Sequence, residues 1–254
     1  MTDFLAFYHQ LGWTLSILVL ATFFAAGAVK GVIGLGLPTV SMGLLGLAMA
    51  PVQAAALLIV PATLTNLWQL AFGGHLRRLW IRLWPMQLAI FIGTAAGTVW
   101  FGLGSGASMA RPLGGALLAY ALLGLAAPTL RIPRAWEVWA GPLCGALTGA
   151  ISAGTGVFVI PAVPYLGALG LSRDELVQAL GLSFTVSTLA LAGSLLWHQQ
   201  LGAAEVGASV LAVVPALFGM LAGQWLRGRI HALWFRRLFF VGLGALGAQL
   251  LLNG

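Results

Sequence analysis

Charged side chains are scarce in this sequence, and their scarcity limits what the protein can be. Only 7% of the 254 residues are charged, whereas soluble proteins carry roughly 25%. Five residues are acidic and 60% of the chain is hydrophobic. Apolar runs long enough to cross a bilayer core about 30 Å thick recur along the chain. The alternation of polar and apolar residues that a transmembrane barrel needs is missing. We therefore expect an all-α, polytopic membrane protein.

The sequence also lacks the residue groupings on which several functions depend. A single cysteine, Cys144, excludes an intramolecular disulfide and a cysteine-based metal cluster. There is no intramembrane His-x-x-x-His and no pair of aspartates, so we predict no catalytic residue, no metal site and no cofactor. Basic residues are dispersed in short loops, which argues against nucleic-acid binding. The N-terminus has no basic region or cleavage site of a secretory signal, so we expect the first helix to be retained.

Charge clusters and Gly/Pro breaks divide the chain into ten apolar segments. Their approximate limits are 11–35, 38–50, 52–72, 82–103, 110–130, 136–156, 157–170, 176–197, 205–226 and 233–252. Segments 38–50 and 157–170 are too short to span a bilayer, and each follows a Gly-rich break. We expect broken or re-entrant helices there. The other segments predict about eight full transmembrane helices.

Arginine sets the expected orientation, because cytoplasmic loops carry the Lys/Arg excess. If the loop after segment 52–72 lies in the cytoplasm, every arginine except Arg111 falls on the cytoplasmic side. This arrangement puts both chain termini on the non-cytoplasmic side. It also requires the two broken pairs to enter the membrane from opposite faces.

Residues 1–130 and 135–254 carry similar motifs in the same order. The motif GAVKG at 27–31 matches GALTG at 145–149. The further matches pair Pro38 with Pro161, Gln53 with Gln178, Thr63 with Thr188, Gly93 with Gly219, and Gly97 with Gly223. We interpret the two parts as inverted-topology membrane repeats, an architecture that many secondary transporters use.

These motifs resemble those of the TauE/SafE sulfite exporter family, also called the TSUP family. Its members have two similar halves, each opening with a Gly-rich motif followed by proline, as KGVIGLGLPTV and TGAISAGTGVFVIPAV do here. The small-residue helices GTAAGTVWFG and GMLAGQWLRG also fit the family pattern. The resemblance implies a permease that moves small sulfur-containing anions, such as sulfite or organosulfonates, across the prokaryotic inner membrane.

The two Gly-rich breaks are the expected anion site. Glycine permits close backbone approach and proline suits the first turn of the next helix, so each break starts a helix whose free N–H groups attract an anion. The predicted substrate-binding residues are Lys30, Gly31, Gly34, Gly36, Thr39, Asn66, Thr148, Gly149, Ser152, Gly154, Thr155, Gly156, Ser183 and Ser187. The alternative for the glycines is close helix packing, and for the hydroxyl and amide groups it is hydrogen bonding within or between helices.

Lys30 is the only lysine, and no acidic residue lies near it in the sequence. An ammonium that faces a cavity would find its counter-ion in the substrate, whereas one near the interface would extend to water. The sequence is consistent with both positions. Broken helices favour alternating access, and the interior-negative potential favours export of anions. The alternative function is a passive anion channel, since helix N-termini and a lysine can also line a pore. The expected partners are a small anion and the lipid bilayer, with a homodimer left open.

Overall fold

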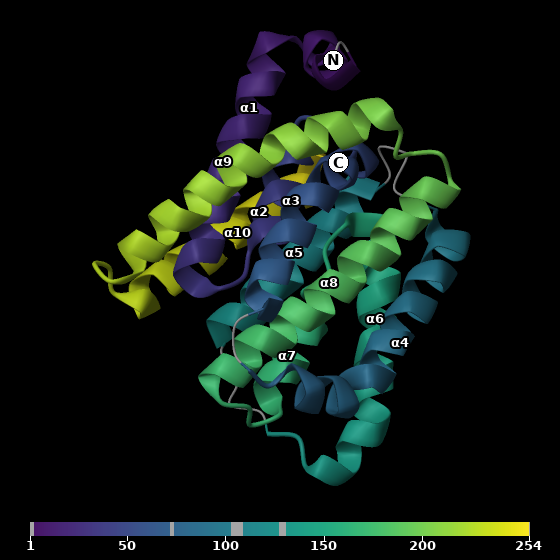
Figure 1. The fold of residues 1–254 in the computed structure, drawn as a ribbon, viewed down its shortest axis with the longest axis vertical. Helices are drawn as coiled ribbons and strands as arrows, with labels where there is room; N and C mark the ends of the chain where they lie inside the picture. Colours follow the sequence, from purple (N-terminus) through teal and green to yellow (C-terminus); the bar gives the residue numbers. More distant parts are fainter. Residues whose placement is uncertain (1–2, 72–73, 103–108, 127–130, 254) are drawn as a thin grey trace.

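The computed structural model describes residues 3–71, 74–102, 109–126 and 131–253. These residues form ten helices and no strand, so the expected all-α class is confirmed (Figure 1). The helices are α1 (Asp3–Ile33), α2 (Leu37–Leu45), α3 (Pro51–Ala71), α4 (Leu76–Phe101), α5 (Ala110–Ala126), α6 (Arg134–Thr155), α7 (Ala162–Ala168), α8 (Arg173–Trp197), α9 (Ala203–Arg227) and α10 (Ala232–Asn253).

Six of these helices are long and apolar enough to cross a bilayer. They are α1 from Gly12 onward, α3, α4, α8, α9, and α10 from Leu233 onward. The 17-residue α5 is shorter, and the 22-residue α6 is not among the six. A multi-pass membrane protein is therefore confirmed, while full spans for α5 and α6 stay a prediction.

The first predicted break lies between α1 and α2. α1 ends at Ile33, and both Gly34 and Gly36 adopt positive φ angles, 80° and 113°. Such angles are readily available only to glycine, which explains why the helix stops here. Pro38 then lies in the first turn of α2, where its missing N–H is not needed.

The second predicted break separates α6 from α7. Gly156 ends α6 with a φ of 67°, and residues 157–161 form no helix. Pro161 directly precedes α7, and a cis peptide bond joins it to Ile160. α7 has seven residues and covers only part of segment 157–170.

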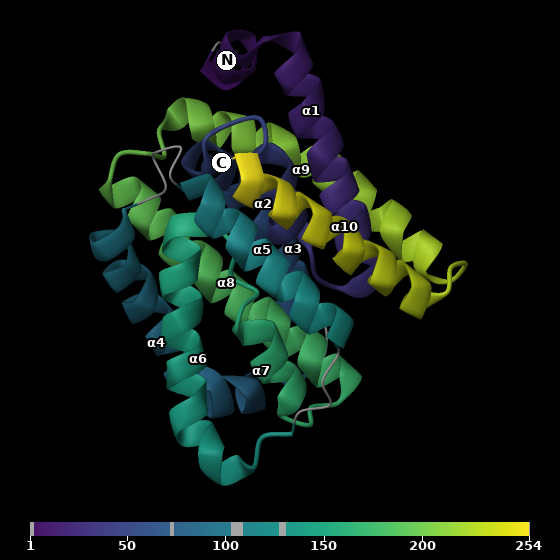
Figure 2. The ribbon, with the colours of Figure 1, turned by 180° about the vertical axis from the view of Figure 1, so that it is seen from behind.

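Helices from distant parts of the chain lie side by side. α1 packs along α9, α4 along α6, α3 along α8, and α5 along α10 (Figures 1 and 2). At its N-terminal end α1 bends at Gly12, whose φ is 79°, and this end stands apart from the other helices (Figure 1). The bundle is thus held together mainly by contacts between residues 1–130 and residues 135–254.

Glycines from the matched motifs line two of these helix contacts. A Cβ atom added to Gly31 of α1 would overlap the backbone of Met220 in α9. A Cβ atom added to Gly149 of α6 would overlap the backbone of Ile90 in α4 in the same way. Small residues let two helix backbones approach closely and gain dispersion energy where lipid removes the hydrophobic drive. The packing alternative therefore holds for these two glycines.

The same contacts pair the glycines of α4 and α9 differently from the sequence matches, by one helical turn. Gly223 of α9 lies against the carbonyl group of Ala28, and Gly93 of α4 lies against that of Ala146. Ala28 and Ala146 hold the same place in the two matched motifs. In these contacts Gly93 takes the place relative to Ala146 that Gly223 takes relative to Ala28, whereas the sequence match pairs Gly93 with Gly219. Spacing alone could not distinguish these alternatives, because glycines four residues apart lie on the same helix face.

Candidate functional site

Lys30 lies in the last turn of α1, directly before the first break, and points into the bundle. Its exposed fraction is 3%, so the side chain does not extend to the surface. The ammonium Nζ donates to Thr65 Oγ1 at 3.0 Å and to Asn66 Oδ1, both on α3. An ammonium has three hydrogens. Among the described residues only these two acceptors hold it, which leaves one hydrogen for another partner.

No carboxylate neutralises Lys30 among the side chains that the structure describes. The ion pairs found there join Arg78 to Glu175 and Arg82 to Glu137. Thr65 and Asn66 offer Lys30 only neutral oxygen atoms. A buried ammonium without a counter-ion is costly, and such groups inside membranes typically serve a substrate or an ion.

Polar contacts close to Lys30 extend to one more helix and to the first break. Asn66 Nδ2 donates to Thr188 Oγ1 of α8 at 3.4 Å. One turn along α3, Gln69 Nε2 donates to the carbonyl oxygen of Gly34 in the first break. Hydrogen bonds near Lys30 therefore join both α8 and the first break to α3.

Four of the predicted hydroxyl groups donate to nearby backbone carbonyls. These bonds run from Thr39 to Gly36, Thr148 to Cys144, Ser152 to Gly149, and Thr155 to Ile151, at distances of 2.6–3.0 Å. A hydroxyl has a single hydrogen, so none of the four can donate to an anion while these bonds persist.

Two predicted serines on α8 differ from these four. Ser183 Oγ accepts a hydrogen bond from Gln87 Nε2 at 3.0 Å, which leaves its own hydrogen uncommitted in the described part of the chain. Ser187 Oγ is buried and has no hydrogen-bond partner there. Residues four apart share one helix face. α8 therefore presents two hydroxyl donors that a ligand could use.

The remaining predicted residues are glycines with three different surroundings. Gly31 and Gly149 lie in the helix contacts, Gly34, Gly36 and Gly156 form the breaks, and Gly154 faces Met109.

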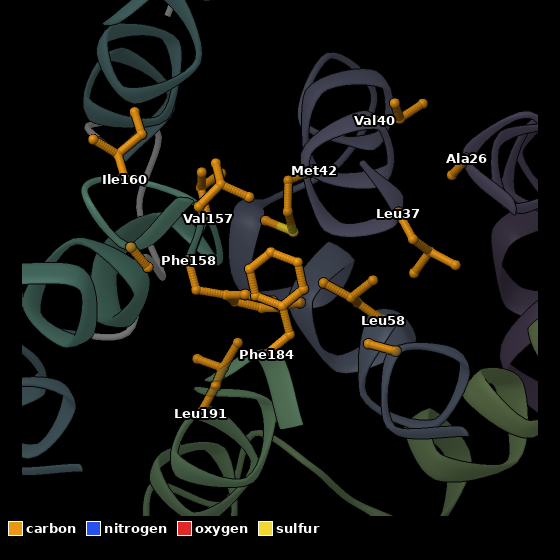
Figure 3. Packing of buried hydrophobic residues seen from close by; sticks show 14 of the residues in the cluster. Ala26, Leu37, Val40, Met42, Leu58, Val157, Phe158, Ile160, Phe184 and Leu191 are labelled. Carbon is orange, nitrogen blue, oxygen red and sulfur yellow. The ribbon is translucent and has the colours of Figure 1, made fainter. Parts of the chain in front are cut away.

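Apolar side chains fill the space between α2 and the second break (Figure 3). Met42 of α2 lies against Gly156, where an added Cβ would be 2.8 Å from its terminal methyl group. The rings of Phe158 and Phe184 pack with centroids 5.5 Å apart beside Val157 and Met42 (Figure 3). An anion could contact both breaks at once only if these side chains moved.

A pocket at one end of α4 and α6 was not anticipated from the sequence. It encloses about 580 Å³, and its polar lining comprises Arg78, Arg82, Arg134, Glu137 and Tyr165. Arg82 donates from Nε and Nη2 to the two carboxylate oxygens of Glu137, at 2.8 and 2.6 Å. These two residues are 55 positions apart, so no local pattern could connect them.

Comparison with curated proteins and with solved structures finds no match. The sequence model of the family described as Sulfite exporter TauE/SafE matches residues 19–250, which is nearly the whole chain. The resemblance drawn from the paired Gly-rich motifs is thereby confirmed. Together with the six apolar spans, this match establishes that the chain belongs to the TauE/SafE sulfite exporter family of membrane transporters.

Proposed function

We propose that the protein is a permease that exports a small sulfur oxyanion, sulfite or an organosulfonate, across the prokaryotic inner membrane by alternating access. Family membership and the apolar spans support transport of a sulfite-type anion. Export agrees with the interior-negative potential, which drives anions outward. The observation that carries the proposal is the buried Lys30 ammonium, which has neutral partners and no carboxylate within the described part of the chain.

We assign the anion to the side of Lys30 that Thr65 and Asn66 leave free. The ammonium would supply the attractive charge, which acts strongly where water is excluded. The uncommitted hydroxyl hydrogens of Ser183 and Ser187 would donate to further anion oxygens. Thr65 and Asn66 position the ammonium and satisfy it when the anion has left.

The helix pairing supports an alternating-access cycle. We interpret residues 1–130 and 135–254 as inverted repeats, because α1 contacts α9 through the same matched glycines by which α6 contacts α4. Packed helices can move past one another by small shear displacements during domain closure. The apolar cluster around Met42 and Phe158 would close the path on one side, and its opening would expose the anion to the other side.

Counterflow in proteoliposomes tests the proposed transport. Vesicles are loaded with unlabelled sulfite, and uptake of labelled sulfite is followed in competition with thiosulfate, methanesulfonate, sulfate and chloride. A carrier gives saturable exchange that the preferred sulfur anions inhibit. Conductance without exchange would identify a passive channel, and the absence of flux for every sulfur anion would refute the assignment.

A matched pair of serine variants tests the site. Ser187→Ala removes a hydroxyl that has no partner among the described residues, whereas Ser152→Ala removes one already bonded to Gly149. A hydrogen bond to a charged group is worth about 1.5–3 kcal/mol. We expect Ser187→Ala to lower transport efficiency about tenfold or more, while Ser152→Ala changes it less than about threefold. Equal effects of the two variants would remove Ser187 from the site.

A further inference from the structure

The pocket between α4 and α6 is separate from the Lys30 network. α4 and α6 line it with their N-terminal turns, and α7 contributes Tyr165. The hydrogen bonds of Lys30 instead involve α1, α3 and α8. The arginine pattern assigns the pocket end of the bundle to the cytoplasm. An exported anion would therefore meet this pocket first.

The pocket carries an excess of positive charge. Three arginines and one glutamate line it, so the lining has a formal net charge of two positive. Glu175 lies outside the lining and pairs with Arg78 at 3.0 Å, which lowers this excess to one. Arg134, in the first turn of α6, takes part in neither ion pair found in the described residues. Its guanidinium is thus the charge that is available to a ligand.

The ion pair of Arg82 and Glu137 fixes the side of the pocket where α4 meets α6. Besides its two bonds to Glu137, Arg82 Nη2 donates to the carbonyl oxygen of Leu169 at 3.2 Å. The arginine therefore links α4 to α6 and to the end of α7. A preformed wall reduces the ordering cost of binding.

The remaining lining is largely apolar and too extensive for a bare inorganic anion. Ile81, Trp84 and Val138 lie in the lining with exposed fractions of 62%, 51% and 67%. Pockets of roughly 300–1,000 Å³ typically hold organic ligands, and this pocket of about 580 Å³ lies within that range. A tetrahedral or pyramidal oxyanion alone would leave most of the apolar wall uncovered.

We propose that this pocket binds an organic anion whose oxyanion head contacts Arg134 and whose apolar body lies against Trp84 and Ile81. It would be a docking site that an exported anion meets on the cytoplasmic side. The proposal rests on the proposed function in one respect: it treats the ligand as a transported anion. Binding of that ligand to the pocket can be measured without transport.

Calorimetric titration of the full chain in phosphatidylcholine nanodiscs tests this site. Naphthalenesulfonate is expected to bind at least about tenfold more tightly than methanesulfonate, since burying about 60 Å² of apolar surface is worth roughly that factor. Uncharged naphthol is expected to bind at least about tenfold more weakly than naphthalenesulfonate, because it lacks the charge-assisted bond. Equal affinity for the two sulfonates would overturn the proposal.

Arg134→Gln identifies the charged contact. We expect this variant to weaken naphthalenesulfonate binding about tenfold, the loss of one charge-assisted bond. Arg111→Gln, which removes an exposed arginine at the start of α5, changes the net charge equally and should leave binding unchanged. Equal effects of the two variants, or no effect of Arg134→Gln, would overturn the assignment.

Two further experiments distinguish binding in this pocket from binding at Lys30 and from binding of a lipid headgroup. Lys30→Met should lower transport about 30-fold or more but keep Arg134-dependent binding. Loss of binding would mean that the probe sits at Lys30 and that the pocket is no site. If no sulfur anion is transported but Arg134-dependent binding persists, the proposed function fails and the pocket stands. Adding phosphatidylglycerol at high ionic strength should leave binding unchanged. Displacement of the probe would show that a lipid headgroup occupies the pocket instead.

Discussion

Replacing Lys30 with methionine separates a role in substrate binding from a role in stability. The substitution keeps a long side chain but removes the ammonium of a lysine that is 3% exposed. The desolvation cost of a buried ammonium is several kcal/mol, and methionine avoids it. Against this, Asn66 Oδ1 loses a buried partner, which costs about 1–3 kcal/mol. We therefore expect the free energy of unfolding to stay the same or to rise.

Transport by the same variant should fall sharply. Without the ammonium, an anion that enters the buried network meets only neutral groups. Loss of one partner from a buried pair of charges costs about 2–5 kcal/mol. The lower value corresponds to about a 30-fold loss of transport efficiency. Sulfite counterflow in proteoliposomes measures this loss, and thermal unfolding of the same purified protein measures stability.

The two measurements together decide the role of Lys30. Transport within about threefold of the parent protein, at equal expression, would show that Lys30 does not contact the anion. A fall in transport accompanied by a fall in stability would instead mean that Lys30 acts by holding α1 to α3. Only lost transport with retained stability supports a substrate contact.

Three further predictions concern packing, the ion pair and orientation. Gly31→Ala should lower the unfolding temperature, because its Cβ would lie 2.8 Å from a backbone nitrogen of α9 and would also overlap a backbone carbonyl there. Gly242 has open space around it, so Gly242→Ala should raise the free energy of unfolding by up to about 1 kcal/mol. An equal response of the two would contradict the tight α1–α9 contact. Glu137→Gln breaks a bidentate pair whose side chains are 20% and 14% exposed and should cost about 1–3 kcal/mol of unfolding free energy, between the values for surface and buried pairs. No change in a denaturation experiment would count against this link. On a Cys144→Ala background, Arg229→Cys should react with an impermeant maleimide only from the cytoplasmic face, and labelling from the outer face would reverse the proposed orientation.

The helical segments could be predicted well because their limits depend on local composition. Hydropathy places the spans, and Gly34, Gly36 and Gly156 mark the breaks because few other residues adopt their backbone angles. The motif glycines Gly31 and Gly149 could be identified as functionally or structurally special. Gly31 contacts α9 and Gly149 contacts α4. No local sequence pattern predicts which distant helix packs against each glycine.

Side-chain partners could not be predicted in the same way. Lys30 and Thr148 occupy matched positions, yet Lys30 reaches across to α3 while the Thr148 hydroxyl bonds to its own helix. Their different lengths and polar groups decide this outcome, and motif matching ignores both. The ion pair of Arg82 and Glu137 is not predictable for a related reason. The sequence relates charges at helix ends to lipid topology, whereas their mutual distance depends on how α4 meets α6.

The pairing of α1 with α9 also affects how the chain assembles during synthesis. α1 ends at Ile33, but α9 begins only at Ala203, so most of the protein must be made before the two can meet. Until then the face of α1 around Gly27 and Gly31 would lack its α9 partner, and its backbone would face lipid. By contrast, only α5 separates α6 from its partner α4 in the chain. We therefore expect an asymmetric order of assembly, in which the α4–α6 contact forms before the α1–α9 contact.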